Sequence, residues 1–265
     1  MAIKRLEISN PEYAQPNTTL LTIHSSHINR RQDVSVYHNC DSKQDVPIVL
    51  LMHGVYGSNW VWMELGGAHK VYEQLKLQGL TDFVLVMPSD GGLWDGSAYL
   101  PLKHHGDYEQ WIIDDVLNCV IANIPQTSEK SNVYISGLSM GGYGALRLGA
   151  KFPNVFKGIS AHSSVTNLDD LQQFIDNSIS EYQCEFEHEA DILYWIQKNQ
   201  SKLPPMRFDC GTNDSLFKSN LALVEQLNEL NIDFVFEQFP GGHEWPYWNK
   251  YLAKTLMFFS KIERT

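Results

Sequence analysis

Residues 132–145 have the sequence NVYISGLSMGGYGA, and this stretch decides the fold. Its first part, residues 132–136, is a short apolar run typical of a strand that is buried on both faces. A Gly-x-Ser-x-Gly pentapeptide centred on Ser139 follows at once, and residues 142–151 have the pattern of a helix. A serine at a sharp strand-to-helix turn needs small neighbours, which the glycines around it provide. The stretch therefore predicts a strand, a nucleophile elbow at Ser139 and a helix.

Strand-like and helix-like segments alternate on both sides of this elbow. The strand-like runs lie at residues 47–52, 83–87, 156–161, 206–210 and 234–239, and the helical patterns at 68–77, 108–123, 215–230 and 246–262. Such alternation predicts an α/β fold with a mostly parallel sheet of about eight strands, covered by helices on both faces. Two further strands, at 18–28 and 34–37, have no helix between them. They predict a hairpin at an antiparallel edge.

Residues 166–205 interrupt the alternation, since they contain no strand-like run. Their acidic side chains are Asp169, Asp170, Asp176, Glu181, Glu185, Glu187, Glu189 and Asp191. We expect an acidic helical insertion over or beside the site. The alternative, a solvent-exposed helical segment with no role in substrate choice, stays open. No boundary divides the chain, so residues 1–265 are expected to form a single domain.

Composition narrows the classes of partner. The chain has 265 residues, a net charge of −11 and 43% hydrophobic residues. The acidic balance argues against a nucleic-acid partner, which would require a clustered basic face. No apolar run reaches 18 residues, and the first ten residues lack the apolar stretch of a secretory signal, so we expect no membrane span and a cytoplasmic location. The oligomeric state is not predicted.

Two loops supply partners for the Ser139 hydroxyl, which needs a base and an orienting acid to attack an ester. Asp214 comes just after the strand at 206–210, and His243 just after the last strand. Both therefore leave the same rim of a parallel sheet as the elbow. The sequence predicts Ser139, Asp214 and His243 as a catalytic triad.

Other acids and bases fit this pattern less well. Asp209 lies within a strand and is expected to face away from the site, Asp233 opens a strand at its wrong end, and Glu244 is expected to be exposed. None of the other candidate bases follows the last strand; they are His53, His104, His105 and His162. We expect no metal site, because no carboxylate–histidine spacing accompanies these histidines.

Ester hydrolysis also needs two N–H donors for the oxyanion. The first is predicted to be the backbone N–H of Met140, the residue after the nucleophile. The second is expected from the loop after the strand at 47–52, with Val55 preferred and Tyr56 as the fallback. His53 is then expected to be structural.

Several motifs resemble the putative-esterase branch of the α/β-hydrolases, which includes S-formylglutathione hydrolases, tributyrin-esterase-like enzymes, feruloyl and acetylxylan esterases, and mycolyltransferases. They are His53-Gly54, Val86-Met87-Pro88-Ser89-Asp90-Gly91-Gly92, the elbow at 137–145, Gly211-Thr212-Asn213-Asp214 and Gly241-Gly242-His243-Glu244-Trp245. The resemblance implies the α/β-hydrolase fold and hydrolysis of carboxylic esters without a cofactor. The loop at 92–99 and the insertion depart from the pattern, and glutathione specificity is not implied. Acyl transfer to an alcohol and a catalytically silent binding protein are the alternatives.

Aromatic residues near the predicted rim suggest how substrate is held. Tyr56, Trp60, Trp62, Trp94 and Tyr99 are predicted to line the substrate pocket. Trp245 and Trp248 are expected to pack the last helix onto the sheet. With acidic surroundings, such a wall favours small, neutral substrates: small-acyl, aryl or acylated-carbohydrate esters.

Overall fold

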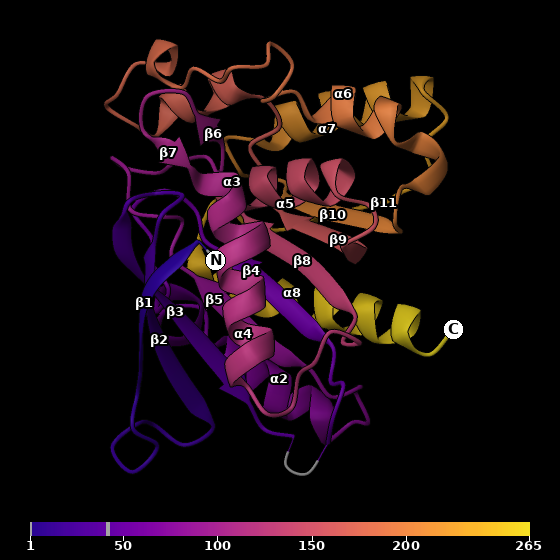
Figure 1. Ribbon diagram of the computed structural model, residues 1–265. Coiled ribbons are helices and arrows are strands. Elements are labelled where there is room, and N and C mark those ends of the chain that lie inside the picture. Colours follow the sequence, from indigo (N-terminus) through magenta and orange to yellow (C-terminus); the bar gives the residue numbers. More distant parts are fainter. Residues whose placement is uncertain (1, 41–42) are drawn as a thin grey trace.

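The computed structural model describes residues 2–40 and 43–265, and within them one large sheet of nine strands organises the fold (Figure 1). The strands stand in the order β1-β2-β3-β5-β4-β8-β9-β10-β11. Their bounds are β1 (Ile3–Ile8), β2 (Thr18–Ser25), β3 (Arg30–His38), β4 (Ile48–Met52), β5 (Val84–Pro88), β8 (Val133–Leu138), β9 (Phe156–His162), β10 (Met206–Gly211) and β11 (Val235–Phe239).

The sheet is parallel from β5 to β11 and antiparallel at its N-terminal edge. The hairpin of β2 and β3 confirms the predicted antiparallel edge. The strand β1 was not predicted, and its side chains are half-buried or exposed. An edge strand with so little buried surface gives only a weak apolar signal.

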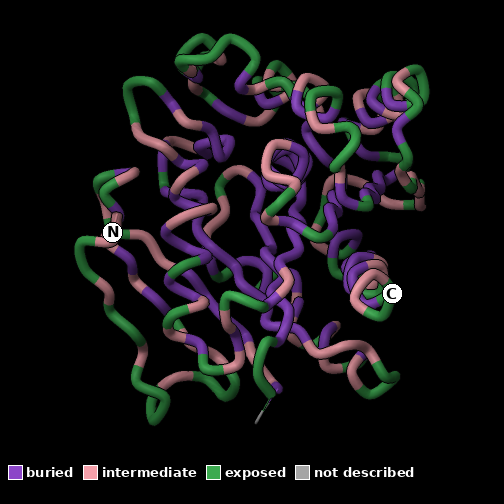
Figure 2. Tube along the Cα trace, turned by 45° about the vertical axis from the view of Figure 1, so that its right-hand side comes forward, coloured by how far each residue is buried: buried purple, intermediate pink, exposed green. Residues whose placement is uncertain are grey.

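Helices cover both faces of the sheet, which confirms the predicted α/β class. Along β4, Ile48, Leu50 and Met52 join one hydrophobic cluster, while Val49 and Leu51 join the other. This alternation is the two-residue period of a strand that is buried on both sides. Figure 2 shows the central strands as an almost continuous buried trace.

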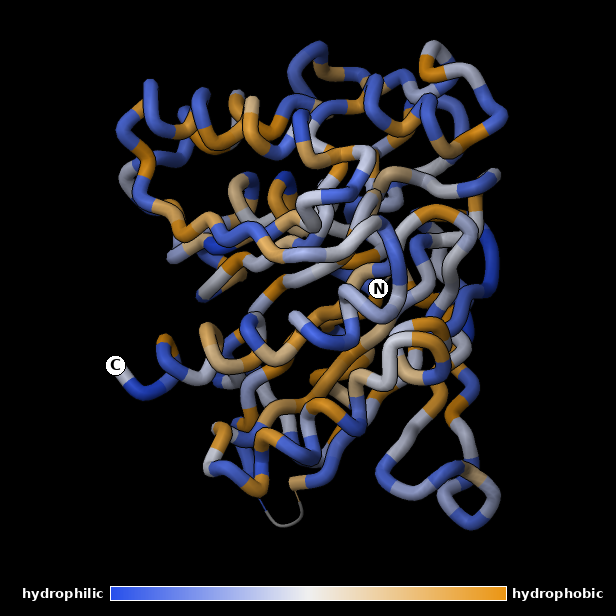
Figure 3. The backbone as a smooth tube through the Cα atoms, turned by 180° about the vertical axis from the view of Figure 1, so that it is seen from behind, coloured by the Kyte–Doolittle hydropathy of each residue, from blue (hydrophilic) through white to orange (hydrophobic). Residues whose placement is uncertain are grey.

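The helices divide between the two clusters. The first cluster contains residues of α3 (Tyr108–Gln110), a π-helical turn η1 (Trp111–Val116), α4 (Leu117–Asn123), α5 (Met140–Lys151), α6 (Ile192–Lys198) and α7 (Phe217–Glu229). The second contains residues of α1 (Val61–Glu64), α2 (Ala68–Lys76) and α8 (Trp245–Glu263). In Figure 3, polar and apolar residues alternate along the turns of α7, as expected for a helix that covers a core on one side.

Residues 166–205 are less helical than expected. Besides α6 they contain three short 3₁₀ helices, η2 (Leu168–Gln173), η3 (Ile179–Glu181) and η4 (Gln200–Lys202). A small two-stranded sheet, β6 (Pro101–Leu102) with β7 (Gly106–Asp107), was not predicted, and Leu102 forms an isolated bridge to Cys184. Figure 1 shows residues 166–205 at the top of the molecule, beyond the end of the sheet where β8 leads into α5.

A buried ion cluster fastens this segment to α5. The Arg147 guanidinium is fully buried and contacts the carboxylates of Glu109 and Glu189 at 2.8 and 2.7 Å. It also donates a hydrogen bond to the Tyr99 carbonyl oxygen at 2.7 Å. Lys151 lies within 2.8 Å of Glu109 and within 2.5 Å of Glu189, so two cations face two carboxylates. Removing one member would leave a buried charge without its partner.

No helix among residues 2–40 and 43–265 is long and apolar enough to span a membrane.

Because Arg147 is the centre of the buried ion cluster, replacing it by alanine is expected to lower the free energy of unfolding by about 3–5 kcal/mol. This is the usual cost of breaking a buried ion pair. Urea unfolding followed by tryptophan fluorescence measures the change. Arg5→Ala is the matched control, because Arg5 forms an exposed ion pair with Glu7 and its loss should change the free energy by less than about 1 kcal/mol. Equal effects of the two substitutions would contradict the structural role of the cluster.

Candidate active site

Ser139 lies between β8 and α5 in a conformation that few non-glycine residues adopt. Its φ is 54° and its ψ −121°, and its N–H donates to the His162 carbonyl oxygen at 3.0 Å. A Cβ on Gly137 would lie 2.2 Å from the Gly141 carbonyl oxygen, and one on Gly141 would lie 2.3 Å from the Met52 carbonyl oxygen. Only glycine fits at these two positions, so the sequence builds a strained elbow that presents the serine hydroxyl.

The structure brings the three predicted triad residues together. His243 Nε2 lies 3.0 Å from Ser139 Oγ, and His243 Nδ1 lies 2.9 and 3.1 Å from the two carboxylate oxygens of Asp214. The Asp214 side chain is fully buried and also accepts a hydrogen bond from the Leu216 N–H at 2.9 Å. With Nδ1–H donated to the carboxylate, Nε2 is free to accept the serine proton.

Two aromatic rings hold the His243 imidazole between them. Phe174 stacks on it, with ring centroids 5.1 Å apart and an angle of 20° between the planes. Trp248 meets it edge-on at 5.0 Å. Sequence reasoning missed Phe174, because the only available signal was the position of its segment after β9, a strand next to the elbow strand.

A cleft of about 530 Å³ opens in front of Ser139 and His243. Its other lining residues are Gly54, Val55, Tyr56, Gly57, Val61, Leu65, Leu138, Phe174, Glu244, Trp245, Pro246 and Trp248. Most of them are apolar or aromatic, which suits the uncharged part of a small molecule. Tyr56 therefore lies on the cleft as predicted. Trp245 and Trp248 line it as well, in addition to the packing role expected of them.

The remaining predicted pocket aromatics lie elsewhere. Trp62 is buried and donates from its indole N–H to the Met52 carbonyl oxygen at 3.0 Å. Tyr99 is also buried, with its hydroxyl donating to the His53 carbonyl oxygen at 2.9 Å. The prediction that these two residues contact substrate is wrong, because both side chains support the backbone beneath the cleft.

Trp60 and Trp94 also lie away from the cleft that Ser139 lines. Trp60 is half-exposed and lines a separate cavity beside β2. Trp94 packs against His105 and Tyr182, with ring centroids 4.6 and 5.2 Å away. The prediction that they line the substrate pocket is wrong, because their side chains leave the correct loops on other sides.

The loop after β4 contains Val55 and Tyr56, the two residues predicted as the second oxyanion donor, and their backbone N–H groups differ. The Tyr56 N–H donates to the Asp95 carbonyl oxygen at 2.8 Å, so it is already engaged. The Val55 N–H has no acceptor among the described residues, and Val55 lines the cleft with Ser139. A Cβ on Gly54 would lie 3.0 Å from Ser139 Cβ, which shows how closely this loop approaches the elbow. The geometry favours Val55 over Tyr56 as the second oxyanion donor.

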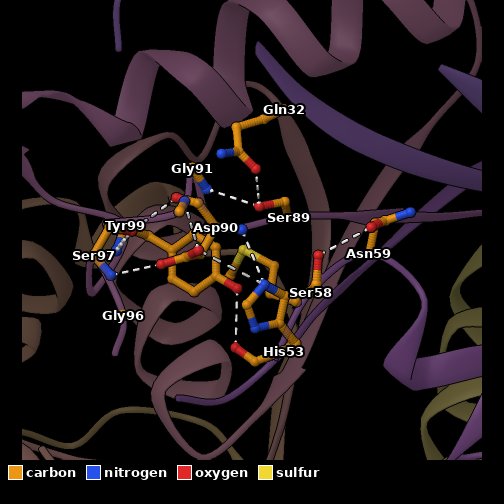
Figure 4. Close-up of polar contacts among 12 residues, drawn as sticks. Gln32, His53, Ser58, Asn59, Ser89, Asp90, Gly91, Gly96, Ser97 and Tyr99 are labelled. Carbon is orange, nitrogen blue, oxygen red and sulfur yellow. Dashed lines mark hydrogen bonds and ion pairs between the residues drawn. The ribbon is translucent and has the colours of Figure 1, made fainter. Parts of the chain in front are cut away.

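His53 fixes the shape of this loop from below (Figure 4). Its Nε2 accepts a hydrogen bond from the Asp90 N–H at 2.9 Å, so the proton is on Nδ1, which donates to the Gly54 carbonyl oxygen at 2.6 Å. The Asp90 carboxylate in turn accepts from the N–H groups of Gly92 and Ser97 at 2.9 and 2.6 Å. His53 is buried and thus acts as a structural hydrogen-bonding residue.

Asp209 and His162, which the sequence also offered as an acid and a base, form a pair of their own. Their side chains are fully buried and 2.9 Å apart. Arg207 contacts the same carboxylate at 2.6 Å, and the Tyr247 hydroxyl donates to it at 2.9 Å. Burial alone would raise the pKa of Asp209, but His162 and Arg207 hold that pKa below its usual value. Neither residue lines the cleft. Glu244 does line it, and its side chain is exposed as expected.

Comparisons with known proteins agree with this fold. The chain is 26% identical to an acetyl esterase of Caldicellulosiruptor saccharolyticus over 99% of both proteins. Its fold resembles the fluorophosphonate-binding serine hydrolase F of Staphylococcus aureus, with a TM-score of 0.80, 22% identity and coverage of 92% of this chain and 98% of the other. Its fold also resembles an S-formylglutathione hydrolase of Staphylococcus aureus, with a TM-score of 0.78 and 20% identity. The match covers 97% of this chain and 100% of the other.

The elbow, the parallel sheet and the loops that meet at Ser139 are the features of an α/β-hydrolase. A family model described as "Putative esterase" matches residues 25–259, which include all of these features. The chain belongs to this esterase family and is a carboxylic ester hydrolase of the α/β-hydrolase fold.

Proposed function

We propose that this protein is a serine carboxylesterase that works through an acyl-enzyme on Ser139. The observation that carries the proposal is the line of hydrogen bonds from Ser139 through His243 to Asp214, which begins at a strained elbow and opens into a cleft. A hydroxyl, an imidazole and a carboxylate in this order form an activated nucleophile.

Each residue then has one role in the reaction. His243 Nε2 accepts the Ser139 proton as Oγ attacks the ester carbonyl carbon, and the Asp214 carboxylate stabilises the imidazolium that forms. The N–H groups of Met140 and Val55 bind the oxyanion. When the intermediate collapses, the ester C–O bond breaks and His243 returns the proton to the departing alcohol. Water repeats the sequence on the acyl-enzyme and releases the acid.

The lining of the cleft supports small-acyl or aryl esters, including acylated carbohydrates, as substrates. Aromatic and aliphatic side chains form most of its surface, and its volume of about 530 Å³ lies in the range of sites that bind small molecules. The acetyl esterase relative supports a short acyl group.

Acidic groups near the cleft favour neutral substrates. Glu244 lines the cleft itself. The pKa of Tyr56, a second lining residue that is mostly exposed, is raised by some loss of solvent contact and then by the carboxylates of Asp95 and Asp176. A negative potential therefore acts on the mouth of the cleft, and it should repel anionic esters.

Replacing Ser139 by alanine should lower kcat for p-nitrophenyl acetate by more than about 10⁴-fold and abolish labelling by a fluorophosphonate. Asp214→Asn should cost about 10⁴-fold, since the imidazole loses the partner that fixes its tautomer. Ser201→Ala is the control, because Ser201 is exposed and does not line the cleft. Full activity of the folded Ser139→Ala protein would overturn the mechanism.

Replacing Phe174 by alanine should lower kcat for p-nitrophenyl acetate by about twofold to tenfold, the size of one aromatic stacking interaction. The reason is that the His243 imidazole loses one of its two restraining rings. Phe186→Ala is the matched control in the same segment, because Phe186 packs on Tyr194 and Trp195, away from the cleft. A change in KM alone would assign Phe174 to substrate contact instead of restraint of the imidazole.

Charge selectivity can be measured with a pair of esters of similar length. The kcat/KM for p-nitrophenyl monosuccinate should be at least about twofold below that for the butyrate ester, given about 0.5–1 kcal/mol per nearby charge in water. Glu244→Gln and added salt should both narrow this gap. A ratio that responds to neither change would remove the electrostatic explanation.

A further inference from the structure

A cluster of three ligand-type side chains lies where the turn between β2 and β3 meets the π-helical turn η1. They are His27 from the β2–β3 turn and Asp114 and Asp115 from η1, and one ligand atom of each lies within 4.8 Å of the others. His27 Nε2 is 3.1 Å from Asp114 Oδ2. None of the three residues lines the catalytic cleft. The expectation of no metal site came from the other histidines of the sequence, and this cluster has no spacing motif, because His27 and Asp114 are 87 residues apart.

One oxygen of this cluster lacks a partner. Asp115 is 1% exposed, and its Oδ2 accepts a hydrogen bond from the Ser25 hydroxyl. Its Oδ1 is buried and has no hydrogen-bond partner among the described residues. An unsatisfied buried carboxylate oxygen is costly, and the Asp115 carboxylate belongs to a cluster that also contains the Asp114 carboxylate. A cation bound to the Asp115 carboxylate would satisfy its free oxygen.

The local backbone explains how two consecutive residues can share one site. Residues of η1 follow the i→i+5 hydrogen-bond pattern of a π-helix, in which neighbours lie closer together around the axis than in an α-helix. The opposite side of the cluster is held as well, because the Ser25 hydroxyl accepts from the N–H of His27 and the Asp107 N–H donates to the His27 carbonyl oxygen. Both sides of the cluster are thus fixed in place.

We propose that His27, Asp114 and Asp115 bind one divalent cation of the zinc class. One imidazole nitrogen and two carboxylate oxygens match the ligands of Zn²⁺, whereas Ca²⁺ and Mg²⁺ prefer sets made of oxygen alone. The side chains of His27 and Asp114 are 27% and 42% exposed, which gives the ion a path from solvent and leaves room for water as a further ligand. The ion ties the β2–β3 turn to η1 and stabilises the fold.

A protonated Asp115 is the competing explanation for the same geometry. Burial raises the pKa of Asp115 and Asp114 raises it too, although the Ser25 hydrogen bond and His27 oppose the rise. A neutral acid would need no cation. Asparagine has nearly the shape of that neutral acid, so Asp115→Asn separates the two explanations.

The test uses the purified full chain, stripped with EDTA and titrated with ZnCl₂. Calorimetry should show one strong site per chain, and Tm should rise by about 5–10 °C at a hundredfold excess over Kd. His27→Ala, Asp114→Asn and Asp115→Asn should each lose both effects. His104→Ala should keep both, because His104 is exposed and lies outside the cluster.

The proposal is overturned if zinc leaves the Tm of the parent protein unchanged, or if His27→Ala keeps the full shift. It is also overturned if Asp115→Asn has the stability of the parent protein in the presence of zinc, since that result identifies a neutral acid. Neither readout depends on esterase activity, so the outcome is independent of the proposed mechanism.

Discussion

The close approach of the α5 backbone to the end of β4 is the contact on which the site depends. Gly141 comes so near the Met52 carbonyl oxygen that a side chain there would overlap it. This contact sets the distance between the Ser139 elbow and the loop that begins at His53, so it also sets where the Val55 N–H can point. The strain at Ser139 persists because the buried strands on both sides of β8 leave it no room to relax. The fold thus stores local strain at Ser139, the residue that we propose as the nucleophile.

Most of what the sequence predicts about the site follows from the positions at which the strands end. Parallel strands deliver their following loops to one rim, so the positions of Ser139, Asp214 and His243 after their strands were enough to bring them together. The aromatic residues were harder, because a position in the correct loop does not say on which side of the loop a ring will lie. Trp62 and Tyr99 turn inward to satisfy carbonyl oxygens of the β4 end, a requirement that apolar patterning does not show.

The segment at 166–205 could not be predicted in detail for a different reason. Its short 3₁₀ helices have no periodic apolar face, and their positions come from distant polar contacts. Tyr143 and Tyr182 donate their hydroxyl hydrogens to carbonyl oxygens of Ala190 and Gly96 across the segment, and Arg147 holds Glu189. Phe174 reaches His243 only because these contacts place its segment beside the cleft. Long-range contacts of this kind leave no local pattern in the sequence.

The way this segment is attached also determines how it responds to heat. The penalty for dehydrating charged groups falls as temperature rises, whereas the gain from burying apolar area levels off. The paired charges of Arg147, Lys151, Glu109 and Glu189 therefore contribute relatively more to cohesion in a warm environment than in a cold one. The segment that carries Phe174, whose ring stacks on the His243 imidazole, is thus held by the kind of interaction that weakens least as the temperature rises.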